Sequence, residues 1–296
     1  MYSSLLGGIV TEPWLMNLPV DEHMVHRGDG VFEACKCVGG KAYLWDRHLK
    51  RLARSAQAVG LALPWTEQEL THIARATAAA SGEMDLVVRI YVGRGPGGFS
   101  ADPRECQGPT LYIVLTRLHP PGPEAYEQGV SLALVGLAPR GRFYAGIKTC
   151  NYLPSALVRL SAAAKGADYG VWVDPEGMVG EGATENIAIV DEDGWVCLPM
   201  PGAILEGITV GRLRELAPSL ADQGVIKGLR TCPLRPRDLF EAREVMLIGT
   251  TIDVLPATVI DGRRVGDGRP GPVARALRQL LVEDLVTNPS STTQLV

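Results

Sequence analysis

The chain has 296 residues, of which 46% are hydrophobic and 21% are charged, and its formal net charge is −4. This composition excludes an intrinsically disordered chain, and the negative charge argues against a nucleic-acid partner. Six cysteines without a CxxC or CxxH pair argue against a metal site. The sequence shows no signal-peptide pattern and no apolar run of about 18 residues, which predicts a cytoplasmic protein without a membrane partner.

The first 118 residues predict a small α/β domain, and the length of the whole chain favours a second domain after it. The expected elements are, in chain order, strands at 31–38 and 41–45, helices at 46–60 and 66–80, and strands at 86–92 and 110–116. Gly39-Gly40 is typical of a hairpin turn. Asp46 is the expected N-cap of the first helix, and Thr66 with Glu69 is the signature of a capping box at the second.

A proline-rich segment then interrupts the pattern. The string His119-Pro-Pro-Gly-Pro123 favours an extended connector, so residues 119–127 are interpreted as an interdomain linker and residues 128–296 as a larger domain. Its expected elements are a strand at 130–137, a helix at 153–164, strands at 169–173, 186–190 and 195–198, a helix from 208 to 216, a strand at 244–249 and a helix at 273–286. The Ser/Thr-rich tail is expected to be frayed.

Lys148 and Glu181 lie in two short motifs, Gly146-Ile-Lys148-Thr-Cys-Asn151 and Val179-Gly-Glu181-Gly, separated by one expected helix and strand. A pyridoxal phosphate enzyme needs such a pair, because the amine forms a Schiff base and the carboxylate keeps the pyridine nitrogen protonated. Taken singly, a surface lysine and a solvent-exposed turn glutamate explain both residues. The interpretation therefore depends on the neighbouring motifs.

Two further segments are suited to holding a phosphate group. Leu205-Glu-Gly207-Ile208-Thr209 stands at the start of an expected helix, where unpaired backbone amides and the helix dipole bind anions. Ile248-Gly249-Thr250-Thr251 ends an expected strand with two hydroxyl groups. Each segment alone is a weak signal, because Gly-x-Thr occurs at many helix starts.

Six motifs in chain order resemble those of the class IV aminotransferases, also called fold-type IV pyridoxal phosphate enzymes. They are His26-Arg-Gly-Asp-Gly-Val-Phe-Glu33, Asp46-Arg-His-Leu-Lys-Arg51-Leu52, the Lys148 segment, Glu181-Gly-x-x-x-Asn186, Leu205-x-Gly207-Ile208-Thr209 and Gly249-Thr250. The resemblance runs from about residue 20 to about residue 285. It implies a homodimer of a two-domain α+β or α/β protein, with a small α/β domain and a larger, cofactor-binding domain that contains a pseudo-barrel sheet.

The resemblance also implies roles for single residues. Lys148 is similar to the lysine that binds pyridoxal 5′-phosphate and moves the proton, Glu181 to the partner of the pyridine nitrogen, and Arg51 to a phosphate ligand. The other implied cofactor-binding residues are Asn186, Gly207, Ile208, Thr209, Thr250 and Thr251. The implied reaction is ping-pong transfer of an amino group between an amino acid and a 2-oxo acid.

Three subfamilies remain open: D-amino acid aminotransferases, branched-chain L-amino acid aminotransferases, and aminodeoxychorismate lyases, which release pyruvate. The Gly28-Asp-Gly-Val-Phe-Glu33 string and the short spacing from Lys148 to Asn151 resemble the D-amino acid enzymes, which we expect first. Residues 261–272 resemble the branched-chain enzymes. The Arg-Gly-x-Gly-Gly start of the loop after the strand at 86–92 resembles the lyases.

That loop continues as Gly97-Gly98-Phe99-Ser100. It lacks the Arg-x-His with which well-known D-amino acid enzymes bind the substrate carboxylate. Other cations on the strands and loops of the first domain must then bind this group. The candidate substrate-binding residues are Phe32, Arg27, Lys36, Arg89 and Arg94.

Overall fold

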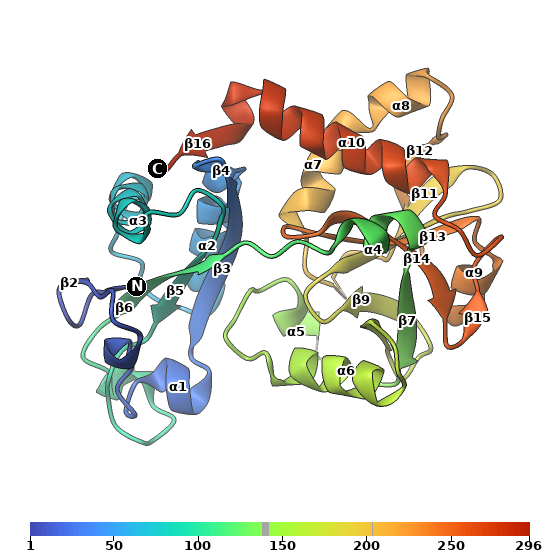
Figure 1. Ribbon diagram of the computed structural model, residues 1–296. Helices are drawn as coiled ribbons and strands as arrows, with labels where there is room; N and C mark the ends of the chain where they lie inside the picture. Colours follow the sequence, from blue (N-terminus) through green and yellow to red (C-terminus); the bar gives the residue numbers. More distant parts are fainter. Residues whose placement is uncertain (138–141, 203) are drawn as a thin grey trace. The chain divides into compact units, whose positions relative to one another are not determined.

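The computed structural model describes residues 1–137, 142–202 and 204–296, and the chain divides into two compact units (Figure 1). The first unit comprises Met1–His119, Ile147–Asn151 and Asn288–Val296, and the second comprises Pro120–Gly146 and Tyr152–Thr287. This division differs from the expected ranges 1–118 and 128–296, because two later segments pack with the first unit. Both segments pair with strands of that unit, and such long-range pairing has no local sequence signal.

The first unit is built on a seven-stranded antiparallel sheet with the order β16-β4-β3-β5-β6-β1-β2. Its strands are β1 (Tyr2–Ser3), β2 (Gly8–Ile9), β3 (Gly30–Val38), β4 (Lys41–Tyr43), β5 (Leu86–Gly93), β6 (Thr110–Arg117) and β16 (Thr292–Gln294). Side chains alternate across each strand. Val31 and Cys35 of β3 therefore join the hydrophobic core, whereas Phe32 and Lys36 lie on the opposite face of the sheet.

Two helices, α2 (Trp45–Ala58) and α3 (Glu67–Ser81), cover the core face of this sheet. The unit also contains α1 (His23–Arg27) and the short 3-10 turns η1 (Pro13–Leu15), η2 (Pro103–Glu105) and η3 (Pro289–Ser291). Leu49 and Leu52 of α2 and Leu70 of α3 are buried in the core. The predicted capping box is confirmed, since the Thr66 hydroxyl accepts from the Glu69 N–H and the Glu69 carboxylate accepts from the Thr66 N–H.

The second unit contains a nine-stranded mixed sheet with the order β12-β11-β10-β13-β14-β7-β8-β9, in which β15 also pairs with β14. Its strands are β7 (Val130–Val135), β8 (Tyr169–Val173), β9 (Val179–Gly182), β10 (Asn186–Val190), β11 (Trp195–Leu198), β12 (Gly228–Thr231), β13 (Glu244–Gly249), β14 (Asp253–Ile260) and β15 (Arg263–Arg264). β10 is buried throughout its length and lies between β11 and β13. The sheet centre thus carries the apolar core of this unit.

Helices pack on both sides of this sheet. They are α4 (Pro123–Gln128), α5 (Arg142–Ala145), α6 (Leu153–Ala164), α7 (Ile208–Leu216), α8 (Pro218–Asp222), α9 (Pro236–Glu241) and α10 (Pro272–Thr287). Figure 1 shows α7 and α10 above the sheet and α6 below it, and each contacts its strands. Among the described residues, every helix is too short or too polar to span a lipid bilayer.

Three local expectations were wrong. The proline-rich connector contains α4, because Pro123 occupies the first helical position, where its fixed φ and missing N–H suit a helix. Asp46 lies in the first turn of α2, and Leu44, at a φ of 56°, stands at the N-cap. The expected frayed tail instead forms β16, which pairs with β4 at the edge of the sheet.

Candidate active site

The segment around Lys148 lies along β3 in the first unit. Phe32 donates its N–H to the Lys148 carbonyl oxygen at 2.9 Å, and Thr149 pairs with Val31 in an isolated antiparallel bridge. The Lys148 N–H donates to the Ser55 hydroxyl of α2 at 3.2 Å. The backbone at Lys148 is therefore held by both a strand and a helix of the first unit.

The Lys148 side chain is 8% exposed and lies against an aromatic platform. Its Nζ is 4.5 Å from the centre of the Phe32 ring, and Phe32 stacks on Tyr91 with ring centres 5.4 Å apart. An ammonium group is attracted to the face of such a ring. Phe32, a predicted substrate residue, and Lys148 are thus brought together on one face of the sheet.

A buried ionic network lies on the core face of β3. Glu33 accepts hydrogen bonds from Arg51 Nε at 2.6 Å and Arg51 Nη2 at 2.8 Å, and from His48 Nδ1 at 2.7 Å. Burial raises the pKa of Glu33, but the hydrogen bonds and charge of Arg51 and the bond from His48 lower it to about 2. Burial lowers the pKa of His48, so its neutral ring donates to the carboxylate. The network orients the Arg51 guanidinium.

Glu33 and His48 are site residues that sequence reasoning missed. The available signal was a charged residue on the apolar face of β3, between Val31 and Cys35, both buried. A carboxylate at such a position requires a buried cation. His48 and Arg51 stand three residues apart on α2, so both reach the same face of the helix.

Two predicted cations share the sheet face of Phe32. Lys36 follows Phe32 at even spacing along β3, and Arg89 pairs with Ala34 across to β5. Lys36 is 6% exposed, with its Nζ 5.5 Å from the centre of the Tyr43 ring. Arg89 donates from Nη1 to the Thr116 hydroxyl at 2.6 Å. The sheet therefore gathers a lysine and an arginine on the face where the Lys148 amine lies.

The other two predicted cations make contacts with loop backbone. Arg27, exposed at the end of α1, donates to the carbonyl oxygens of Phe99 and Ser100 in the glycine-rich loop. Arg94 donates from Nε and Nη2 to the Asp29 carboxylate at 3.0 and 2.9 Å, and also to carbonyl oxygens after α2. These contacts favour a loop-positioning role for Arg27 and a structural role for Arg94.

In the second unit, Glu181 and Asn186 form one hydrogen-bonded cluster with the segment before α7. The Glu181 Oε2 accepts from the Leu205 N–H at 3.1 Å and from the Asn186 side-chain amide at 3.2 Å. The same amide nitrogen of Asn186 donates to the Leu205 carbonyl oxygen at 2.9 Å. Asn186 therefore positions Glu181, a role that its place at the start of β10 did not reveal.

The N-terminus of α7 adjoins this cluster. Gly207 is the N-cap and supplies no side-chain cap to the first turn, which begins with Ile208 and the buried Thr209. A Cβ atom at Gly207 would lie 2.0 Å from the Asn186 side-chain oxygen, so a larger residue would displace the Asn186 amide from its present contacts. The first amides of α7 are consequently open to an anion, because a helix start leaves its N–H groups without backbone partners.

The predicted threonine pair lies in the turn between β13 and β14. Gly249 and Asp253 pair across this turn, which holds Thr250 and Thr251, both half-buried. Asn186 pairs with Ile248, the residue before Gly249, and α7 contacts β13. One end of the sheet thus holds this turn, the start of α7 and the Glu181 cluster.

Comparison with known proteins decides the family. The family model for amino-transferase class IV matches residues 30–260. The chain belongs to the class IV aminotransferases. A chloroplastic D-amino-acid transaminase of Arabidopsis thaliana is 36% identical, with 100% of this chain and 79% of the relative covered. A putative branched-chain-amino-acid aminotransferase of Methanocaldococcus jannaschii is 30% identical, with 88% of each chain covered.

Solved structures confirm the fold-type IV architecture. The branched-chain amino acid aminotransferase of Escherichia coli is similar with a TM-score of 0.89 and 25% identity, over 98% of this chain and 97% of that chain. A hypothetical aminotransferase from Mycobacterium tuberculosis in a PLP-bound form has a TM-score of 0.79 and 26% identity, over 96% and 98%. This class IV aminotransferase is therefore an enzyme that transfers amino groups between amino acids and 2-oxo acids.

The cofactor of class IV aminotransferases is pyridoxal 5′-phosphate, and the residues present fit it. The uncapped start of α7 offers amides to a phosphate, and the carboxylate oxygen of Glu181 is fixed by two donors. Lys148 supplies a buried primary amine. Within the ranges that the structure describes, no group of three or more His, Cys, Asp or Glu side chains is arranged to hold a metal ion.

Proposed function

We propose that this aminotransferase takes its amino group from D-amino acids. The observation that carries the proposal is the pair of cations, Lys36 and Arg89, on the sheet face where the Lys148 amine lies over Phe32. They provide the positive charge for a substrate carboxylate that the Gly97-Gly98-Phe99-Ser100 loop lacks. The D-configuration is supported by the 36% identity to a D-amino-acid transaminase over the whole chain.

The proposed chemistry assigns one task to each charged group. Pyridoxal phosphate, when bound, withdraws electrons from the substrate's α-carbon. The Lys148 amine would hold the cofactor at rest and, when free, would accept and return the proton of the substrate's α-carbon. The Glu181 carboxylate would accept a hydrogen bond from the pyridinium nitrogen and stabilise its charge, while Asn186 and Leu205 hold Oε2 in place.

The proposed phosphate site combines backbone amides with side chains. Ile208 and Thr209 donate backbone N–H groups from the first turn of α7, where the helix dipole favours an anion. Thr250 and Thr251 donate hydroxyls from the adjacent turn. Arg51 of the first unit is proposed as a further phosphate ligand from its place in the motif Asp46–Leu52, and Glu33 accepts hydrogen bonds from its Nε and Nη2.

Half-reactions with single amino acids test the substrate assignment. We expect D-alanine or D-glutamate, added to holoenzyme without any oxo acid, to remove the visible absorbance of the lysine-bound cofactor. Branched-chain L-amino acids are expected to react at least about 10²-fold more slowly, because an opposite hand misplaces the α-hydrogen or the carboxylate. If L-leucine reacts faster than every D-amino acid, the branched-chain alternative is correct. Turnover that needs no oxo acid and releases pyruvate indicates the lyase instead.

Replacement of Glu181 with glutamine tests the pyridine-nitrogen role. The variant keeps an oxygen acceptor for Leu205 and Asn186, so we expect the fold to persist. Turnover is expected to fall by roughly 10²-fold, because a neutral amide stabilises the ring charge less. Steady-state kcat at matched cofactor occupancy measures this, with the exposed Glu192→Gln as control. Equal turnover in both variants assigns Glu181 a structural role only.

The expected homodimer and cytoplasmic location stay predictions. Support for an association surface comes from the N-terminal segment of the first unit, where the side chains of Leu6, Trp14 and Val20 are 59%, 72% and 71% exposed. Met1, Met16 and Leu18 of the same segment help to line a cavity of about 430 Å³, whose other walls include α1, β5 and β6. Apolar surface concentrated in this way is typical of protein–protein contacts.

A further inference from the structure

A cavity of about 580 Å³ in the second unit is lined by three arginines. Arg269 lies in the loop before α10, and Arg275 and Arg278 lie on α10 itself. Tyr126 and Glu127 of α4 form the facing wall. We call it the arginine cavity. None of these residues belongs to the Glu181 cluster or to the phosphate-binding segments.

The positive charge of the arginine cavity is not balanced by the protein. Within the described ranges, none of its three arginines forms an ion pair, and Glu127 is the single acidic residue that lines the cavity. Three guanidinium groups held close together repel one another, and an anion removes that cost. The local charge therefore selects a negatively charged ligand.

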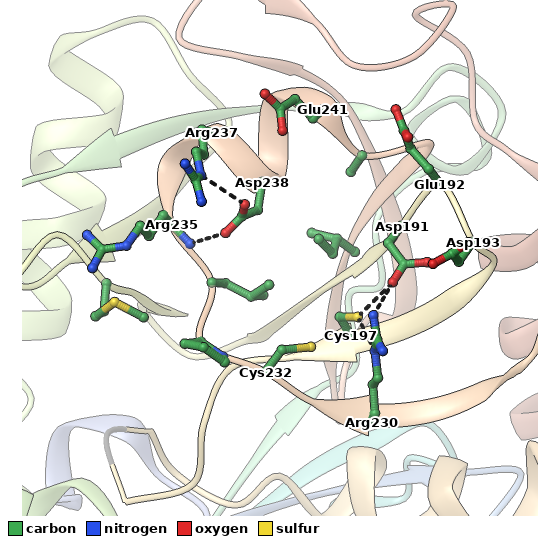
Figure 2. A pocket seen from close by; sticks show the side chains of 15 residues that line it. Asp191, Glu192, Asp193, Cys197, Arg230, Cys232, Arg235, Arg237, Asp238 and Glu241 are labelled. Atoms are coloured by element: carbon green, nitrogen blue, oxygen red, sulfur yellow. Dashed lines mark hydrogen bonds and ion pairs between the residues drawn. The ribbon is translucent and has the colours of Figure 1, made fainter.

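A second cavity of the same unit is lined by arginines together with several carboxylates (Figure 2). There, Arg230 pairs with Asp191 at 2.5 Å and Arg237 pairs with Asp238 at 3.5 Å. Two of its three arginines are thus paired with neighbouring carboxylates, and acidic residues outnumber the arginines among the lining side chains. The arginine cavity differs in that Glu127 is the single acidic residue beside its three arginines.

The walls of the arginine cavity are positioned by specific contacts. The Arg278 guanidinium lies 3.9 Å from the centre of the Tyr126 ring, and the Tyr126 hydroxyl donates to the Ile252 carbonyl oxygen at 3.1 Å. Arg275 donates from Nη2 to the Pro270 carbonyl oxygen at 3.0 Å. The Arg278 Nε is buried without a hydrogen-bond partner in the described part of the chain, an unfavourable state for a charged donor.

We propose that the arginine cavity is a second anion-binding site, for a small organic molecule that carries two or more negative charges as phosphate or carboxylate groups. Guanidinium groups bind both kinds of oxyanion in pairs of hydrogen bonds. The cavity volume lies within the range of small-molecule sites and exceeds what a single inorganic ion fills. The proposal concerns residues outside the transamination site and does not depend on the identity of its substrate.

Isothermal titration of the holoenzyme with pyrophosphate and, separately, with glutarate tests this site. The informative variant is Arg269→Gln/Arg275→Gln, since both side chains are exposed and their replacement is compatible with the fold. We expect at least one anion to bind the wild type and its affinity to fall at least about tenfold in this variant. Tighter binding of pyrophosphate identifies a phosphorylated ligand, and tighter binding of glutarate a dicarboxylate.

Controls separate this site from the transamination site. Arg243→Gln removes an exposed arginine that does not line the cavity and is expected to bind as the wild type does. Binding at the arginine cavity leaves the visible absorbance of the cofactor unchanged. The proposal is overturned if neither anion binds at millimolar concentration, or if the double variant, shown by thermal unfolding to be folded, retains wild-type affinity. Binding that shifts the visible absorbance and persists in the double variant overturns it as well.

Discussion

Replacement of Lys148 with alanine is expected to reduce transamination by at least about 10³-fold. The variant lacks the amine proposed to bind the cofactor and to move the α-proton, and water cannot supply these functions in a buried setting. Single-turnover conversion of a D-amino acid, followed by absorbance at matched cofactor occupancy, measures the loss. We expect thermal unfolding to change little, because the neighbouring backbone hydrogen bonds to Phe32 and Ser55 do not involve the side chain.

The matched control is Lys50→Ala, since that lysine is exposed on α2, with its side chain 62% accessible and paired with Asp46. Its turnover is expected to stay within about twofold of the wild type, because an exposed pair contributes little to structure. Full turnover in Lys148→Ala would falsify the assignment of this residue as the cofactor-binding amine. A loss of the same size in Lys50→Ala would instead point to a general effect of the substitutions on folding.

Replacement of Glu33 with glutamine is expected to lower the free energy of unfolding by about 3–5 kcal/mol. Glu33 is completely buried, and its removal leaves the charge of Arg51, itself 6% exposed, without its carboxylate partner. Urea denaturation at neutral pH measures the effect. The control Glu83→Gln breaks an exposed pair with Arg117 and is expected to cost less than about 1 kcal/mol. Equal losses in the two variants contradict a buried network.

The Glu33 network also predicts a pH dependence. Its pKa in the folded protein is about 2, below the ordinary value of 4.5, so the network stabilises the fold fully above about pH 4.5. That contribution is lost as the pH falls from 4.5 toward 2, when the carboxylate becomes protonated. The wild type is therefore expected to lose more stability than Glu33→Gln between about pH 5 and about pH 3. If both proteins lose the same stability over this pH range, other carboxylates cause the acid sensitivity.

Much of the fold followed from local sequence signals. The hairpin of β3 and β4 around Gly39-Gly40 and the capping box of α3 were predicted correctly, because turn and cap residues act within a few positions of themselves. β14 was not expected, since Pro256 lies within it and proline is unusual in a central strand. α1 was also missed, because its five residues are too few for a periodic pattern.

The chemistry of the site was more predictable than its assembly. Lys148, Glu181 and Asn186 stood in motifs whose residue types already indicated an amine, a carboxylate and a neighbouring amide. Their contacts did not follow from those motifs. The hydrogen bond from Asn186 to Glu181 joins residues on different strands, and the Lys148 segment pairs with β3, which lies far earlier in the chain.

The sequence by itself thus determined the family and the proposed chemical groups, because an amine, a carboxylate and a helix start with open amides are properties of residue types at short spacings. Only the tertiary structure decided that Glu33 and His48 hold Arg51, and that Lys36 and Arg89 share the face of Phe32. The physical reason is that these contacts depend on strand register and helix docking. Strand register and helix docking depend on how the whole core is buried, and no single sequence motif encodes that burial.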